Sequence, residues 1–248
     1  MGKLLQKAWR LLKNACYKTS FVFLALGVAP LSGLYTDDFR KARADGLYEQ
    51  LTEGQVVLPS STFSQIDELQ KGIILHLKMA DADIASLSLE VSYINNPTAN
   101  AYALPDGRIL ITTGMLSRLE TSSQLAGVLG HEITHIKNNH YGKRLGAVSI
   151  LAGTSLAAFG CFGLPGLLVA LPVSYLSEAF LCRTLEYEAD ENSVDLLRVC
   201  GYDYNQFGTF LGTRISHPKY RPPLDDIREL TFSHPIIYKR ALRVLSSN

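Results

Sequence analysis

The chain has 248 residues, of which 47% are hydrophobic and 19% charged, which is enough for one compact domain with a real core. Its formal net charge of +1 excludes the strongly basic surface typical of nucleic-acid-binding proteins, so no nucleic-acid partner is expected. The four cysteines have no metal-binding spacing, and we interpret three of them as buried thiols. A disulfide between Cys182 and Cys200 is the open alternative.

Residues 1–19 are basic and lack acidic side chains, and an apolar run follows from Phe21 to Tyr35. A basic segment before an apolar one is the order of a secretion signal or an N-terminal anchor. The run is short for a full membrane span, and its small-residue cleavage pattern is poor. We therefore expect residues 1–36 to be an uncleaved anchor or an inefficient signal. Residues 37–248 would then form the active domain on the far side of a membrane.

Residues 36–60 are polar and mixed, and we expect them to wrap the surface. From Thr62 to Lys78, apolar residues recur at helical spacing and predict a helix. Residues 87–94 alternate between apolar and polar side chains, which indicates a half-buried strand. Residues 101–104 and 108–113 flank Pro105-Asp106-Gly107, a sequence typical of the turn in a β-hairpin.

The stretch from Thr121 to His140 predicts an amphipathic helix that begins with a capping box of Thr121 and Gln124. His131 and His135 lie four residues apart, so both imidazoles lie on one face of this helix, as two ligands of one zinc ion must. Glu132 can accept a proton from a metal-bound water. The alternative is two surface histidines that happen to flank a glutamate.

A catalytic zinc ion needs a third protein ligand. His140 is rejected for this role because, nine residues after His131 on a continuing helix, it would point to the opposite side. We expect it to be a solvated residue or one in the outer shell of the metal.

Residues 145–182 are apolar, and Glu178 is their only charged residue. Glycines and prolines interrupt them near the middle and again at Pro172. Two halves of about eighteen residues can form a membrane hairpin. They can equally form core helices of a soluble domain, and a membrane-dipping or buried pair is favoured over two true spans.

A second helix is predicted from Arg183 to a C-terminal stop at Gly201. Glu186 and Asp190 share one of its faces. Glu186 can donate an oxygen to zinc, and Asp190 can accept the second ring N–H of a ligand histidine. An ordinary charged helix face is the alternative. Further helices are predicted at residues 205–215 and 235–245, on either side of a proline-rich loop that we interpret as a lid.

Four elements in order resemble the HtpX and CaaX-prenyl-protease family of zinc metallopeptidases, peptidase family M48. They are Asn100-Ala101-Tyr102, the H-E-x-x-H segment from His131 to His135, Glu186 to Asp190, and His234-Pro235 with Arg240. The layout is most similar to that of the small periplasmic or membrane-anchored quality-control members.

The resemblance implies one Zn²⁺ per chain, with His131, His135 and Glu186 as its ligands and Glu132 as general base. It implies that His234 and Arg240 act near the metal. The fold implied is α+β and zincin-like, mainly helical with a small sheet. The edge strand of that sheet, at Asn100, Ala101, Tyr102 and Ala103, would bind substrate.

The function expected from these patterns is zinc-dependent hydrolysis of peptide bonds in misfolded or membrane-associated proteins. The oxyanion would be stabilised by His234 or Arg240, or His234 would instead block the zinc reversibly. The expected location is the cell envelope, periplasmic or membrane-anchored, with the mitochondrial inner membrane as the alternative. Two other functions remain open, a client-binding chaperone or assembly factor and a structural zinc domain.

Overall fold

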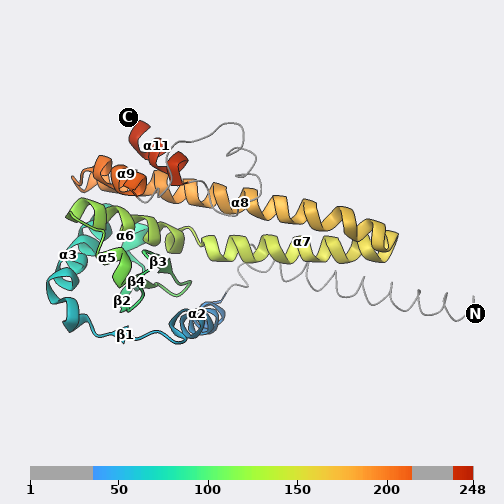
Figure 1. Cartoon of the computed structure of the whole chain (residues 1–248), viewed down its shortest axis with the longest axis horizontal. Coiled ribbons are helices and arrows are strands. Elements are labelled where there is room, and N and C mark those ends of the chain that lie inside the picture. Colours follow the sequence, from blue (N-terminus) through green and yellow to red (C-terminus); the bar gives the residue numbers. More distant parts are fainter. Residues whose placement is uncertain (1–35, 214–236, 248) are drawn as a thin grey trace, which may run out of the picture. The chain divides into compact units, whose positions relative to one another are not determined.

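Helices make up most of the structure, a computed structural model that describes residues 36–213 and 237–247 (Figure 1). A small mixed sheet completes an α+β composition, in agreement with the fold class predicted from the sequence. The described residues belong to two units. Gly142–Cys182 lies in one, and Asp37–Tyr141 lies in the other with residues 183–213 and 237–247. The predicted N-terminal anchor and lid loop, together with His234, lie outside the described residues.

The sheet has four strands in the order β1-β2-β4-β3. The central pair, β2 and β4, is parallel, and the two outer pairs are antiparallel. This order leaves β3 at one edge. The strand predicted at residues 87–94 forms over its second half only, whereas the hairpin is present as predicted. The strands are β1 (Val57–Leu58), β2 (Glu90–Ile94), β3 (Ala101–Ala103) and β4 (Arg108–Thr112).

The β3–β4 turn depends on Gly107. Its φ of 105° is in the region that favours glycine, and a Cβ there would lie 1.9 Å from the carbonyl oxygen of Ser88. The pair Tyr102–Leu110 lies at the middle of the β3–β4 register. The Leu104 N–H donates to the Arg108 carbonyl at 2.8 Å, and the Thr112 N–H donates to the Asn100 carbonyl at 3.1 Å, so Asn100 and Leu104 face β4. Because backbone groups alternate in direction along an antiparallel strand, those of Ala101 and Ala103 point away from β4.

Helix α2 (Asp37–Thr52) replaces the surface segment that the sequence predicted. It is fastened to the β3–β4 hairpin by long-range contacts. Arg40 Nε donates to the Pro105 carbonyl at 2.8 Å, and Arg108 Nη2 lies 2.6 Å from Asp45 Oδ1. The guanidinium of Arg108 also lies 5.1 Å from the ring centroid of Tyr48. These contacts therefore fix the position of α2 against the β3–β4 turn.

Helix α6 (Ser122–Lys137) lies at the centre of its unit, between the sheet and α9 (Tyr204–Thr213) (Figure 1). Two glycines allow side chains of neighbouring helices to approach α6 closely. A Cβ at Gly127 would lie 2.3 Å from the Phe207 ring, and one at Gly130 would lie 2.8 Å from Ser193 Oγ. The Ser193 hydroxyl donates to the Gly127 carbonyl at 3.0 Å. Other described elements of this unit are η1 (Ser60–Phe63), α3 (Ser64–Ala80), α4 (Ala82–Ala85), α5 (Thr113–Leu116) and α11 (Ile237–Ser246).

Two long helices, α7 (His140–Phe162) and α8 (Leu164–Val199), meet at Gly163, whose φ is 68°. Within Gly142–Cys182 they are joined by Ser155 and Ser174, whose hydroxyls lie 3.0 Å apart. Both helices are long and apolar enough to cross a membrane, by length and composition, and little of either apolar window is buried. The predicted interruption at Pro172 is wrong, because α8 continues through it.

The three cysteines among the described residues form no disulfide, so the alternative of a Cys182–Cys200 bond is wrong. Cys182 is buried and Cys200 is partly buried, in keeping with their helical context. Cys161 is exposed on the apolar pair of helices, and the expectation that it is buried is wrong for that reason.

Candidate metal centre

The start of α6 sets the register of the site. Thr121 Oγ1 accepts from the Gln124 N–H at 3.2 Å, as the predicted capping box requires. Gln124 Oε1 accepts from the N–H of Glu120, one residue before the position that the box predicts, at 2.7 Å. From this start, His131 and His135 follow on one face, one turn apart.

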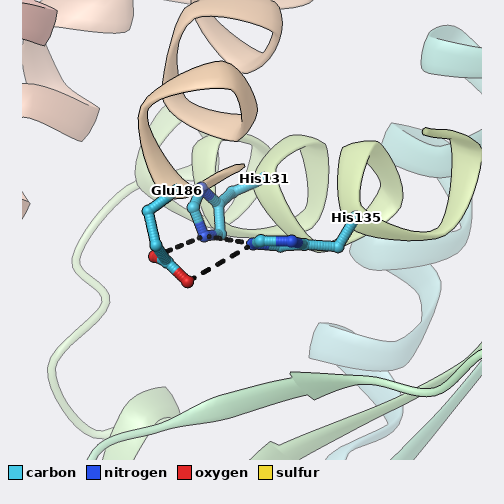
Figure 2. A group of neighbouring side chains, drawn as sticks. All are labelled: His131, His135 and Glu186. Atoms are coloured by element: carbon cyan, nitrogen blue, oxygen red, sulfur yellow. Dashed lines mark hydrogen bonds and ion pairs between the residues drawn. The ribbon is translucent and has the colours of Figure 1, made fainter. Parts of the chain in front are cut away.

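Three candidate ligands meet at this face (Figure 2). The Nε2 atoms of His131 and His135 lie 3.1 Å apart. Glu186, which α8 supplies from the other side, places Oε2 at 3.6 Å from His131 Nε2 and Oε1 at 3.8 Å from His135 Nε2. Tetrahedral zinc with bonds of about 2.0–2.2 Å separates its ligand atoms by about 3.3–3.6 Å. Two imidazoles and a carboxylate at these distances fit such an ion.

A second layer of charged groups surrounds the candidate ligands. Asp190, one turn after Glu186 on α8, lies 3.0 Å from His131 Nδ1 and has a side chain that is 1% exposed. Arg240 of α11 makes two contacts with Asp190, at 2.7 Å through Nε and 2.8 Å through Nη2. Its Nη1 lies 2.8 Å from Glu186 Oε2. One guanidinium therefore bridges both carboxylates.

The two histidines differ in their protonation without metal. Burial and the charge of Arg240 lower the pKa of His131, but its bonds to Asp190 and Glu186 outweigh them and raise it to about 9. Burial, followed by the charge on His131, lowers the pKa of His135 to about 3. Burial raises the pKa of Asp190. The charge of Arg240 and the hydrogen bond with His131 lower it by more, so the pKa is below its normal value. The buried Asp190 is thus held as a carboxylate.

Glu132 lies between the candidate ligands and the edge strand. Burial is the main cause that raises its pKa, and the charge of Glu186 adds to it. His131, Arg240 and a hydrogen bond from the backbone N–H of Ala103 act in the opposite direction. A carboxylate with a raised pKa is suited to accept and return a proton near neutral pH.

A cavity of about 410 Å³ opens onto these groups. Its polar lining includes Glu132 with the three candidate ligands and Arg240. Asn100, Ala101 and Tyr102 line it from the edge of the sheet. Its apolar lining consists of Met115, Val128, Phe207, Phe210 and Leu211. Three of the four predicted substrate-binding residues therefore face the same cavity as the predicted ligands. The fourth, Ala103, does not line the cavity but donates its backbone N–H to Glu132.

His140 lies beside a candidate ligand, in agreement with the expected outer-shell position, but the continuing helix assumed for it is wrong. Helix α6 ends at Lys137, and Asn139 takes a φ of 48°, so the chain turns and α7 begins at His140. The turn places His140 Nδ1 2.8 Å from His135 Nδ1, and the residue is 3% exposed. It is not part of the candidate ligand group, as expected. The Asn138-Asn139 pair was the one signal in the sequence that the helix stops, since asparagine tolerates positive φ.

Comparison with known proteins decides the family. The model of Peptidase family M48 matches residues 63–247, three quarters of the chain. The chain belongs to peptidase family M48. The resemblance found in the sequence is thereby confirmed, and M48 membership supports a metallopeptidase that acts on polypeptides.

Relatives of this M48 chain come from mitochondria and bacteria. It is 32% identical over 124 residues to the mitochondrial metalloendopeptidase OMA1 of Arabidopsis thaliana, covering 50% of this chain and 25% of the relative. Identity to OMA1 of Schizosaccharomyces pombe is 26% over 210 residues, covering 77% and 61%. Identity to the β-barrel assembly-enhancing protease of Escherichia coli is 28% over 158 residues, covering 58% and 31%. The matches thus span between a quarter and three fifths of the length of these relatives.

Proposed function

We propose that this chain is a zinc-dependent endopeptidase that hydrolyses peptide bonds of misfolded or membrane-associated proteins. The observation that carries the proposal is the meeting of His131, His135 and Glu186 beside the partly buried Glu132, in a cavity lined by a sheet edge. A purely structural zinc site does not account for a carboxylate in the cavity next to only three ligands.

Zn²⁺ held by the three ligands would supply a Lewis acid that activates water and polarises a peptide carbonyl. Glu132 accepts the proton of the attacking water and passes it to the leaving amine. Its raised pKa brings the carboxylate closer to the range in which both transfers are efficient.

The edge strand β3 would hold the substrate by its backbone. The backbone groups of Ala101 and Ala103 point away from β4, and a peptide can pair with them as one more strand. The Ala103 N–H also donates to Glu132, which links the bound backbone to the proton acceptor. Recognition of this kind reads few side chains, as an enzyme that degrades misfolded proteins requires.

Arg240 would act as a positioning residue. Its guanidinium already contacts Glu186 and Asp190, so it fixes a ligand and the partner of a second ligand. These contacts favour positioning over a direct contact with the oxyanion. His234 remains the candidate for the oxyanion contact or for a reversible block of the metal.

The proposed setting is a membrane surface in the cell envelope, with the mitochondrial inner membrane as the alternative. The names of the relatives place them in mitochondria or link them to β-barrel assembly. The exposed apolar helices of Gly142–Cys182 add a surface that suits contact with lipid.

The decisive experiment compares the wild type with Glu132→Gln for zinc content and for cleavage of unfolded casein. We expect one zinc per chain in both proteins and cleavage by the wild type alone. Glu68→Gln, at an exposed position of α3, serves as the matched control and should cleave normally. Cleavage by Glu132→Gln would overturn the mechanism. Zinc in both proteins with cleavage in neither would favour a client-binding role instead.

A further inference from the structure

A buried histidine outside the ligand set lies directly behind the metal site. The imidazoles of His135 and His140 meet edge to face, with ring centroids 4.8 Å apart and planes at 83°. Their Nδ1 atoms are separated by 2.8 Å, which is a good hydrogen-bond distance. The contact exists because the turn at Asn139 brings His140 back toward α6.

The roles of the four ring nitrogens follow from this geometry. His135 directs Nε2 toward His131 and Glu186, so Nε2 is its ligand atom and must be unprotonated to bind metal. The neutral ring then carries its proton on Nδ1 and donates it to His140 Nδ1. His140 must accept there, which puts its own proton on Nε2. That nitrogen lies 3.6 Å from Glu188 Oε2, which is too far for a hydrogen bond, so the carboxylate acts on the ring electrostatically.

The carboxylate of Glu188 is itself fixed in place by a hydrogen bond. Glu188 Oε1 accepts from Asn138 Nδ2 at 2.8 Å, and Asn138 is the C-cap residue of α6. The helix that carries both histidine ligands therefore also anchors Glu188. On the other side of the site, Asp190 contacts His131 Nδ1 directly at 3.0 Å. Each ligand histidine thus has a partner on Nδ1, a carboxylate for His131 and a second histidine for His135.

We infer that His140, supported by Glu188, is a positioning residue that fixes the tautomer and orientation of His135 for metal binding. The inference rests on the proposed function, because it assumes that His135 is a ligand. Loss of such an outer partner typically weakens metal affinity by about 10–100-fold. The ring of His140 also fills space, so the hydrogen bond must be tested separately from packing.

The test measures the dissociation constant for Zn²⁺ of the full chain by competition with a chromophoric chelator. We expect His140→Ala to weaken zinc binding by about 10–100-fold. His140→Asn should recover most of the affinity, because its side-chain oxygen can accept the His135 N–H in place of Nδ1. His76→Ala is the control: His76 is exposed, contacts Tyr202, and should leave the zinc affinity unchanged.

A second variant keeps the inference testable if His140→Ala destabilises the metal-free protein in thermal unfolding. Glu188→Ala alters a side chain that is 37% exposed, and it should weaken zinc binding in the same direction by a smaller factor. Wild-type affinity in His140→Ala, or no recovery in His140→Asn, would overturn the positioning role alone. A wild-type chain that binds no zinc would overturn the proposed function as well.

Discussion

Arg240 compensates the negative charges of two carboxylates around the site, Asp190 and Glu186. Asp190 has a 1% exposed side chain, and Arg240 gives it two hydrogen bonds while also contacting Glu186. Removing Arg240 leaves the buried Asp190 with only partial compensation from His131, and it takes the same partner from Glu186. We expect Arg240→Met to lower the free energy of unfolding of the metal-free protein by about 3–5 kcal/mol, measured by urea titration.

Two comparisons separate this effect from a general weakening of α11. The double variant Asp190→Asn with Arg240→Met should lose less than the sum of the single losses, because residue 190 then carries no charge that needs a partner. Arg243→Met changes a half-exposed arginine of the same helix, which stacks on Tyr187 at 4.1 Å, and should cost at most about 1 kcal/mol. Strictly additive losses would show that Arg240 does not compensate Asp190.

At the residue scale, the sequence alone predicted which side chains lie together wherever this depends on helical spacing. His131 with His135, and Glu186 with Asp190, were placed correctly on shared faces because a spacing of four fixes the face. The continuing helix assumed for His140 was wrong because one left-handed residue, Asn139, follows the end of α6. A side-chain pattern does not reveal such a turn, which decides where the imidazole of His140 lies.

At the scale of elements, the spacing between helices is set by glycine. A Cβ at Gly127 would lie 2.3 Å from the ring of Phe207, which belongs to the buried face of α9. We expect Gly127→Ala to cost about 1–3 kcal/mol of unfolding free energy, because α9 must move or Phe207 must leave its rotamer. Phe207 also lines the cavity, so cleavage of casein should fall in parallel.

The chain offers a matched control for this substitution. Gly72 is an exposed position within α3 where an added Cβ meets nothing within 4 Å. There the same change should stabilise the protein by up to about 1 kcal/mol, since alanine favours the helix. Equal effects of Gly127→Ala and Gly72→Ala in urea unfolding would mean that close packing at Gly127 is unimportant.

The elements that the sequence missed are those held by distant partners. Helix α2 has a short apolar stripe, Ala44, Leu47, Tyr48 and Leu51, which packs against Leu104 and Leu110. Arg40 and Asp45 add contacts with Pro105 and Arg108, some 60 residues away. A stripe this short, among charged residues, does not reveal such distant partners. At Pro172 the sequence predicted a break that is absent. The apolar residues before and after it in α8 allow the helix to continue through the proline.

At the scale of whole units, Gly142–Cys182 has the features of a hairpin that enters lipid. Its tip is apolar and exposed, with Phe162 at 73% and Leu164 at 61% exposure. The backbone at the tip is satisfied, since Gly163 donates to Phe159 and Leu167 donates to Gly163. The charged pair Arg144–Glu178 lies at the opposite end of the hairpin. A spanning hairpin would expose the apolar tip to water on the far side, so we expect this one to end within the bilayer.

Cys161 beside the tip is an exposed native reporter of this depth. With Cys16, Cys182 and Cys200 changed to serine, we expect Cys161 in lipid vesicles to resist a membrane-impermeant maleimide before and after permeabilisation. It should react once detergent replaces the lipid. A cysteine from Glu49→Cys on α2, placed in the same background with Cys161→Ser, samples the other unit and should react after permeabilisation without detergent. Reaction of Cys161 on permeabilisation alone would indicate a true span, and rapid reaction in intact vesicles would place the hairpin in water.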